Sequence, residues 1–202
     1  MKNLWLLNAS LQGDRGNSSK LAAQFVEKWQ EGEAIHVVKV DLNDLNLPHL
    51  SAQEMQTWSM VSDNMSPEQV KLAAYSNDLL AQLERSDAIV IGMPMYNFTV
   101  PTTFKAWIDR IARAGRTFSY TSEGPKGHLV GKTVYVMAAR GGIYQGTEND
   151  TQTPYLRLVL GLLGITDVHF VYLEGLNMGD EFAQNSWQQA REEINELLPA
   201  IA

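Results

Sequence analysis

The sequence predicts an α/β fold, a three-layer sandwich in which a five-stranded parallel sheet of order 2-1-3-4-5 carries helices on both faces. Five short strand-like runs alternate with segments of helical spacing, which is typical of a parallel sheet covered on both sides. The first run, residues 3–9, is apolar before it ends in small and polar residues, as expected of a fully buried strand. A length of 202 residues suits one domain, so residues 1–202 are expected to form a single domain.

Each strand is assigned from a short run of apolar or β-branched residues. The expected strands are residues 3–9, 35–40, 87–93, 132–140 and 167–175. Five such strands in βα alternation favour the order 2-1-3-4-5, one of the two common orders of open parallel sheets.

The helices are assigned from apolar residues that recur at steps of three and four. They are expected at residues 18–31, 66–85, 102–113, 153–164 and 180–198. Residues 41–65 are polar and mixed, and we expect a long excursion with one short helix there. Residues 114–131 hold four glycines and one proline, which predicts a loop with a hairpin around RTFSY.

Two of these helices carry more specific signals. The stretch SPEQ at 66–69 has the form of a capping box that opens the second helix. Four apolar side chains of that helix are expected to face inward: Val70, Leu79, Leu80 and Leu83. After Pro101, which can open the third helix, four apolar residues fall on one face: Phe104, Trp107, Ile108 and Ile111.

Composition excludes several classes of function. The net charge of −7 argues against a general binder of nucleic acid or of anionic membranes. The absence of cysteine excludes disulfides, thiolate metal sites and cysteine nucleophiles, and it is compatible with the cytoplasm. The apolar run at the N-terminus is too short for a signal peptide, and no segment approaches the length of a membrane span.

Other catalytic motifs are missing or incomplete. The sequence has neither the G-x-G-x-x-G dinucleotide fingerprint nor a G-x-S-x-G nucleophile elbow. GHLVGKT at 127–133 resembles a phosphate loop, but it is one residue short and leads into a strand. The four histidines are scattered and the acidic residues show no paired pattern, so we expect no metal site and no catalytic histidine.

A site on such a sheet is expected beyond the carboxyl ends of the strands, near the switch in strand order. This selects the loops after the first, third and fourth strands: SLQGDRGNSS, PMYNFTV and RGGIYQG. In the first of them, hydroxyls and backbone N–H groups at a helix start can hold a phosphate. The alternative for that loop is simple N-capping of the helix by Asn17 or Ser18.

The other two loops suit a flat ligand. The aromatic residues Tyr96 and Phe98 can flank a planar ring, and the amide between them can meet the edge of a heterocycle. The alternative is that both rings only cover the top of the sheet. The RGG at 140–142 lets backbone approach a ligand closely, or it forms an ordinary tight turn.

Taken together, these stretches resemble one family. PMYNF, WIDRIARAGRTFSYTSEGP, RGGIY and TPYLRLVLGLLGITDVHFVYLEG are similar, at these spacings, to the FMN-dependent NADH-azoreductases. That family lies within the flavodoxin-like NAD(P)H:quinone oxidoreductases, and the similarity spans nearly the whole chain. It implies a flavodoxin-like fold and a homodimer with one FMN per subunit.

The resemblance also implies where FMN would bind. The residues around the phosphate would be Ser10, Gly16, Asn17 and Ser18. Those lining the isoalloxazine would be Met95, Tyr96, Asn97 and Phe98, and those at its pyrimidine edge Ala139, Arg140, Gly141 and Gly142. On the substrate side, besides Phe98, Tyr120 would overhang the ring and Tyr144 would lie at the mouth.

The backbone N–H of Asn97 would lie near the flavin N5. Replacing Asn97 by Pro is therefore expected to weaken FMN binding or slow hydride transfer while leaving the fold largely intact.

Some positions depart from the family's pattern. Ala9 and Ala139 stand where relatives often have serine, which bears on how tightly FMN is held. Leu162 and Leu163 occupy a segment where some relatives place a Phe near the partner's flavin, which bears on substrate preference.

The implied activity is a ping-pong, two-electron reduction of quinones by NADH or NADPH, with reductive cleavage of aromatic azo compounds to amines. FMN carries this chemistry, so no protein nucleophile is needed. Two alternatives remain from the sequence: a flavodoxin-like electron carrier and, with less support, a phosphodiesterase acting on acyl carrier protein.

Overall fold

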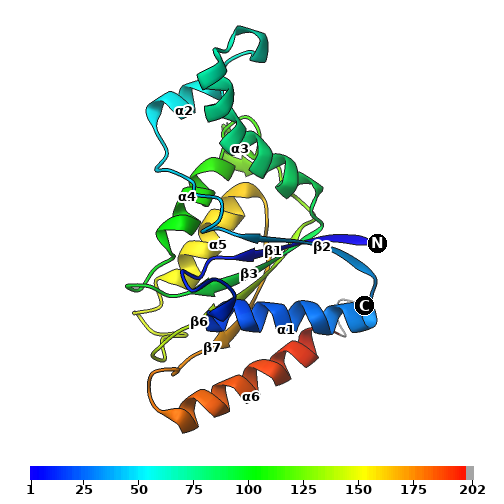
Figure 1. Ribbon diagram of the computed structural model, residues 1–202, viewed down its shortest axis with the longest axis vertical. Coiled ribbons are helices and arrows are strands. Elements are labelled where there is room, and N and C mark those ends of the chain that lie inside the picture. Colours follow the sequence, from blue (N-terminus) through cyan, green and yellow to red (C-terminus); the bar gives the residue numbers. More distant parts are fainter. Residues whose placement is uncertain (199–202) are drawn as a thin grey trace.

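The sheet of the chain has the expected topology. A computed structural model describes residues 1–198, so the last four residues of the expected domain, 199–202, lie outside the described residues. Five parallel strands follow the order β2-β1-β3-β6-β7, which confirms the order 2-1-3-4-5 (Figure 1). The strands are β1 (Lys2–Asn8), β2 (Ile35–Asp41), β3 (Ala88–Pro94), β6 (Thr133–Ala139) and β7 (Asp167–Leu173).

Helices cover both faces of this sheet (Figure 1). The expected helices are confirmed as α1 (Asn17–Gly32), α3 (Pro67–Arg85), α4 (Thr102–Ile111), α5 (Gln152–Leu163) and α6 (Asp180–Leu197). The remaining helical segments are shorter: η1 (Gly13–Arg15), α2 (Ala52–Thr57) and η2 (Ser62–Asn64).

Alternation along β1 explains the two-sided core. Because successive side chains of a strand point to opposite faces, Leu4 and Leu6 pack with α1 and α6, whereas Trp5 and Leu7 pack with α3, α4 and α5. The interior residues of β3 are buried without exception, as the central strand of such a sheet requires.

Helix α3 begins where the sequence predicts, but its first half lies outside the core. Ser66 Oγ accepts from the N–H of Gln69, whose side chain accepts from the N–H of Ser66, so the capping box is confirmed. Val70, expected to face inward, is 50 % exposed. Figure 1 shows why: the first half of α3 projects beyond the sheet with α2 beside it, and only its later residues meet the core.

A buried ion pair anchors the excursion that contains α2. Arg110 Nη2 lies 2.7 Å from Glu54 Oε2, and both side chains are buried, which joins α2 to α4. The carbonyl oxygen of Arg110 also accepts a hydrogen bond of 2.8 Å from Ser76 Oγ on α3. Loss of one partner of such a pair would leave a buried charge, so the pair holds the excursion in place.

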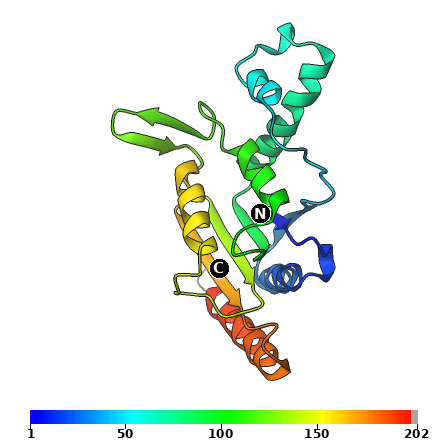
Figure 2. The same ribbon diagram turned by 90° about the vertical axis from the view of Figure 1, so that its left-hand side faces the viewer.

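The expected hairpin is confirmed as β4 (Phe118–Thr121) and β5 (Gly124–Gly127), and it projects from the body of the molecule (Figure 2). It is attached at the carboxyl end of α5. The N–H of Leu129 donates to the carbonyl of Leu163 at 2.9 Å, and Gly127 packs directly against Gly164.

Two properties of residues 1–198 bear on function. Within that range no helix is both long and apolar enough to cross a bilayer. In the same residues no group of three or more histidine or acidic side chains is arranged to hold a metal ion.

Candidate functional site

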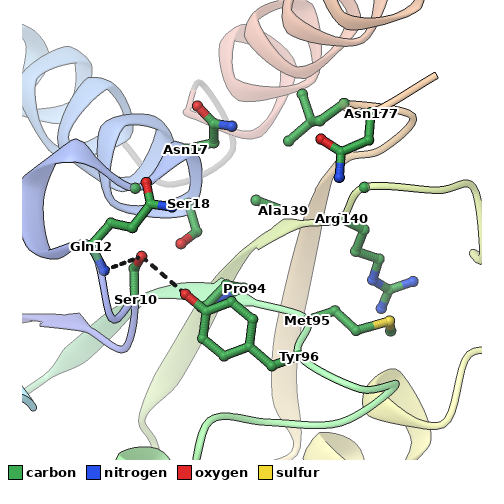
Figure 3. A pocket seen from close by; sticks show the side chains of 13 residues that line it. Ser10, Gln12, Asn17, Ser18, Pro94, Met95, Tyr96, Ala139, Arg140 and Asn177 are labelled. Atoms are coloured by element: carbon green, nitrogen blue, oxygen red, sulfur yellow. Dashed lines mark hydrogen bonds between the residues drawn. The ribbon is translucent and has the colours of Figure 1, made fainter. Parts of the chain in front are cut away.

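A pocket opens at the carboxyl edge of the sheet, where four loops meet (Figure 3). These loops follow β1, β3, β6 and β7. The residues that line the pocket are Ser10, Gln12, Gly16, Asn17, Ser18, Pro94, Met95, Tyr96, Ala139, Arg140, Gly141, Leu176 and Asn177.

The loop after β1 forms a cradle at the start of α1. Gly16 is the N-cap residue. Its backbone lies so close to Ser10 that an added Cβ would be 2.2 Å from Ser10 Oγ. The hydroxyl of Ser18 is buried and has no hydrogen-bond partner within residues 1–198. The first N–H groups of a helix have no intrahelical acceptor, so the cradle offers several unpaired donors to an anion.

This geometry rejects simple capping as the role of Asn17 and Ser18. The helix boundary falls at Gly16, and no side chain caps it. Asn17 and Ser18 therefore stand inside the first turn and line the pocket, where the buried Ser18 hydroxyl has no partner within residues 1–198 (Figure 3).

The loop after β3 is a two-residue turn with an unusual backbone. Tyr96 and Thr99 exchange two N–H···O hydrogen bonds of 3.0 Å, and the residues between them, Asn97 and Phe98, have φ of +48° and +63°. Positive φ at both central positions is the type I′ pattern, which favours Asn and Gly. For a bulky residue such as Phe98 it is a strained conformation.

The two aromatic residues of that turn, Tyr96 and Phe98, have different surroundings. The Tyr96 hydroxyl lies 3.4 Å from Ser10 Oγ and accepts from the N–H of Leu11 at 3.2 Å, which joins the first two loops. Phe98 is 49 % exposed, and its ring meets that of Tyr144 edge to face at 5.4 Å. Phe98 is therefore a half-exposed residue that packs on Tyr144 beside the pocket, and it does not line the pocket itself.

The loop after β6 lines the pocket with backbone. The Arg140 side chain is fully buried and points away from Ser10, Asn17 and Ser18 (Figure 3). Its guanidinium lies 2.9 Å from Asp150 and 3.0 Å from Glu174. Arg140 therefore stabilises the loop, and its main chain does so too: its N–H donates to the Leu173 carbonyl at 2.9 Å and its carbonyl accepts from the N–H of Leu176 at 3.3 Å.

The hydrogen bonds around Asp150 favour the ionised form of its carboxyl group. Its burial raises the pKa, but hydrogen bonds from Thr153 and Arg140 outweigh that effect and hold the pKa of Asp150 below its ordinary value. The Thr153 N–H donates to it at 3.0 Å.

A fourth loop, residues 174–177, braces the third. The N–H of Asn177 donates to the Gly141 carbonyl at 2.9 Å, and that of Gly175 donates to the Gly142 carbonyl at 3.0 Å. The Asn177 amide packs so tightly on Gly141 that a Cβ there would be 2.5 Å from Nδ2. The nearest atoms to that Cβ would all belong to the Asn177 side chain, so a larger residue at position 141 would require this amide to move.

Most of the expected cofactor-binding residues come together. Nine of the twelve line the pocket: Ser10, Gly16, Asn17, Ser18, Met95, Tyr96, Ala139, Arg140 and Gly141. Asn97, Phe98 and Gly142 stand beside it, and Gly142 packs against the Tyr144 hydroxyl.

Tyr120 is the exception. It is 78 % exposed on the hairpin at the carboxyl end of α5, whereas the amino end of α5 meets the pocket through Gln152, whose Nε2 donates to the Pro94 carbonyl. Within one chain Tyr120 therefore lies away from the pocket, and its expected place over the substrate side stays a prediction.

Four lining residues are not among the expected binding residues: Gln12, Pro94, Leu176 and Asn177. Gln12 and Pro94 nevertheless lie in two of the three loops that the sequence selects. Leu176 and Asn177 belong to the loop after the fifth strand, which lies away from the switch in strand order and is not selected by that rule. The signal was available, since all parallel strands end at the same edge of a sheet.

The pocket holds little chemistry of its own. Among the residues that line it, only Tyr96 and Arg140 are ionisable, and Arg140 is engaged by two carboxylates. It therefore contains no free acid, base or activated nucleophile, and its walls suit a ligand that brings its own reactivity.

Comparisons with known proteins agree with this description. A family model described as Flavodoxin_2, with a flavodoxin-like fold, matches residues 2–198. The chain belongs to the Flavodoxin_2 family. This confirms the flavodoxin-like fold expected from the sequence, and the relatives within the family confirm the resemblance drawn there.

Curated relatives share most of their length with this member of Flavodoxin_2. A protein of Pseudoalteromonas atlantica named FMN-dependent NADH:quinone oxidoreductase is 77 % identical over 200 residues, 99 % of each chain. One of Alteromonas mediterranea with the same name is 46 % identical over 197 residues, 98 % of each chain.

Solved structures of azoreductases share the fold. An azoreductase from Bacillus anthracis str. Sterne superposes with a TM-score of 0.88 at 27 % identity, covering 98 % of this chain and 99 % of that one. An FMN-dependent NADH-azoreductase from B. anthracis str. Ames Ancestor, in complex with FMN, gives 0.84 at 25 % identity, with 97 % and 99 % covered.

Proposed function

We propose that this protein is an FMN-dependent NADH:quinone oxidoreductase that also cleaves aromatic azo compounds reductively to amines. One observation carries the proposal: the unpartnered, buried hydroxyl of Ser18 lies in a cradle of unpaired helix N–H groups, in a pocket that has no free acid or base. The names of the curated relatives and of the azoreductase structures support the same activity.

The residues present fit FMN. Ser10, Ser18 and the first-turn N–H groups of α1 would hold its phosphate, and a helix N-terminus needs no added cation for that. The ring would lie between the turn of Tyr96–Thr99 and the backbone of residues 139–142. Bound FMN would supply the two-electron, hydride-accepting chemistry.

The protein would contribute orientation and charge stabilisation. The N–H groups of Gly141 and Gly142 make no hydrogen bond within residues 1–198, so they are available at the pyrimidine edge, where negative charge develops. Tyr96 would keep the phosphate cradle and the ring shelf in register through its contacts with Ser10 and Leu11.

The remaining features of the proposal concern assembly and location. The protein would be a cytoplasmic homodimer of single flavodoxin-like domains that acts on small quinone and azo substrates, with neither nucleic acid nor membrane as partner. Tyr120, exposed on its projecting hairpin, would then be offered to the partner subunit's site rather than to its own.

Steady-state kinetics test the activity. Protein reconstituted with saturating FMN should oxidise NADH when a quinone is present, and should consume two NADH for each azo bond cleaved. Phosphodiesterase activity without NADH oxidation would overturn the proposal, and so would bound FMN that passes electrons to a protein acceptor but to no quinone.

A further inference from the structure

A second hollow lies beside the pocket, between α1 and α6, which run side by side under one face of the sheet (Figure 1). We call it the α1–α6 groove. The residues that line it are Asn17, Lys20, Gln24, Gln184, Trp187, Gln188 and Arg191. Asn17 lines both hollows, so the groove begins where the pocket ends.

The groove is built from one face of each helix. Asn17, Lys20 and Gln24 recur at steps of three and four along α1, which is the spacing of one helical face. The α6 residues follow the same spacing. Arg191 connects the walls: its Nε donates to Gln24 Oε1 at 3.4 Å, and its guanidinium lies 5.4 Å from the Trp187 ring centroid.

The lining of the α1–α6 groove is positively charged, whereas the whole chain is negatively charged. The protein has 23 acidic and 16 basic residues, yet the groove is lined by two cations, Lys20 and Arg191, and by no carboxylate. Cations in a hollow attract anionic ligands. One carboxylate stands beside the lining, since Gln188 Nε2 donates to Glu192 Oε1 at 3.0 Å. The half-buried Trp187 adds an aromatic surface, and four amide side chains add donors and acceptors.

We propose that the α1–α6 groove binds the adenosine diphosphate end of NADH while its nicotinamide end enters the adjoining pocket. This deepens the proposed function and rests on it. Lys20 and Arg191 meet the diphosphate, Trp187 supports the adenine, and the glutamines meet ribose hydroxyls and the adenine edge. The two cations also offset the repulsion between this diphosphate and the FMN phosphate beside Asn17.

The test compares two reductants that differ only in the part assigned to the groove. Dihydronicotinamide riboside carries the same hydride donor as NADH but lacks both phosphates and the adenosine. In the FMN-loaded double variant Lys20→Glu/Arg191→Glu, KM for NADH should rise at least ~10-fold, because two charge-assisted contacts are replaced by repulsion. KM for the riboside and for the quinone should stay within about twofold.

A matched variant controls for overall charge. Lys28→Glu/Arg85→Glu changes the net charge by the same amount at two exposed positions outside the groove and the pocket. It should leave both reductants unchanged. A rise in the NADH KM equal to that of the groove variant would mean that long-range attraction alone is at work, and it would overturn the site.

A binding measurement adds a readout independent of turnover. Titration calorimetry of the FMN-loaded protein with ADP should give a binding isotherm that the groove variant loses and the control variant keeps. If the double variant fails to fold, Gln184→Glu/Gln188→Glu, which adds negative charge at two exposed amides, should produce the same selective loss.

The possible failures are distinguishable. Equal effects on NADH and on the riboside, or none on either, would refute the groove while leaving the oxidoreductase intact. If wild-type protein oxidises neither reductant, the proposed function fails first.

Discussion

Gly16 and Ser10 stand so close that a Cβ on Gly16 would lie 2.2 Å from the Ser10 hydroxyl oxygen and 2.6 Å from its Cβ. Real side chains do not tolerate such contacts, so Gly16→Ala must displace either Ser10 or the start of α1. We expect a loss of about 1–3 kcal/mol in the free energy of unfolding, as for other overpacked sites. FMN affinity, measured by quenching of flavin fluorescence, should fall at least ~10-fold.

The same helix supplies the control for that substitution. Gly32, at its other end, has nothing within 4 Å of an added Cβ. Gly32→Ala should leave FMN affinity unchanged and should not lower stability, since alanine is the better helix former. If Gly16→Ala bound FMN as tightly as Gly32→Ala, the cradle would not be the phosphate site.

Ser18 allows a test in which stability and affinity move in opposite directions. Its buried hydroxyl has no partner within residues 1–198, so Ser18→Ala removes an unsatisfied group and should hold or raise the stability of the protein without FMN. Its affinity for FMN should fall by about 1–3 kcal/mol, the cost of losing a hydrogen bond to a charged phosphate. Chemical denaturation and flavin titration measure the two effects separately.

Ser19 is the natural comparison for Ser18. Its hydroxyl is also buried and unpartnered, but Ser19 does not line the pocket. Ser19→Ala should hold or raise the stability of the protein without FMN, as Ser18→Ala does, and should leave FMN affinity unchanged. An equal loss of affinity in both variants would point to a general disturbance of the helix start.

The turn at Asn97 corrects an expectation drawn from the sequence. Proline fixes φ near −65°, whereas Asn97 has φ of +48°. Asn97→Pro should therefore break the turn and cost about 2–4 kcal/mol of stability, rather than leave the fold intact. Asn97→Gly, which suits positive φ, should keep stability and FMN affinity within a few tenths of a kcal/mol.

Thermal unfolding and flavin titration of the two Asn97 variants are the measurements. Normal stability in the proline variant would contradict the type I′ geometry at this position. Impaired FMN binding in the glycine variant would mean that the Asn97 side chain, and not only its backbone, contacts the cofactor.

Asp150 predicts how stability responds to acid. Because its pKa is lower in the folded protein than in the unfolded chain, it stabilises the fold above its unfolded pKa, and this contribution is lost as pH falls through the folded pKa. Asp150→Asn should reduce stability at neutral pH by about 1–3 kcal/mol, since Glu174 still faces Arg140. It should also flatten the decline of stability between about pH 5 and pH 3.

Urea unfolding across that pH range checks the Asp150 prediction. Parallel curves for wild type and Asp150→Asn would show that other carboxylates control the acid sensitivity.

How far the sequence could predict this protein depends on whether a feature is local. The capping box at Ser66 and Gln69 is read correctly because both partners lie within one turn of helix. The burial of Val70 in that helix is predicted wrongly, because the first half of α3 projects beyond the sheet. The hydrophobic face of α3 meets the core only further along the helix. Helical spacing predicts a face, not what covers it.

The candidate site divides in the same way. Strand periodicity and loop composition predict that Ser10, Tyr96 and Gly141 lie at one edge of the sheet, since every parallel strand ends there. The bracing loop at Asn177 was missed because its role arises from packing on Gly141 across the sheet.

By itself, the sequence determined the order of elements, the sheet topology and the three loops that most of the pocket uses, because periodicity and turn chemistry act over a few residues. Only the tertiary structure decided that Arg140 turns inward to Asp150 and Glu174, that Ser18 is left with an unused hydroxyl, and that Tyr120 stands away from its own pocket. Those outcomes depend on contacts between segments far apart in the chain, where charge pairing and close packing override what each segment would do alone.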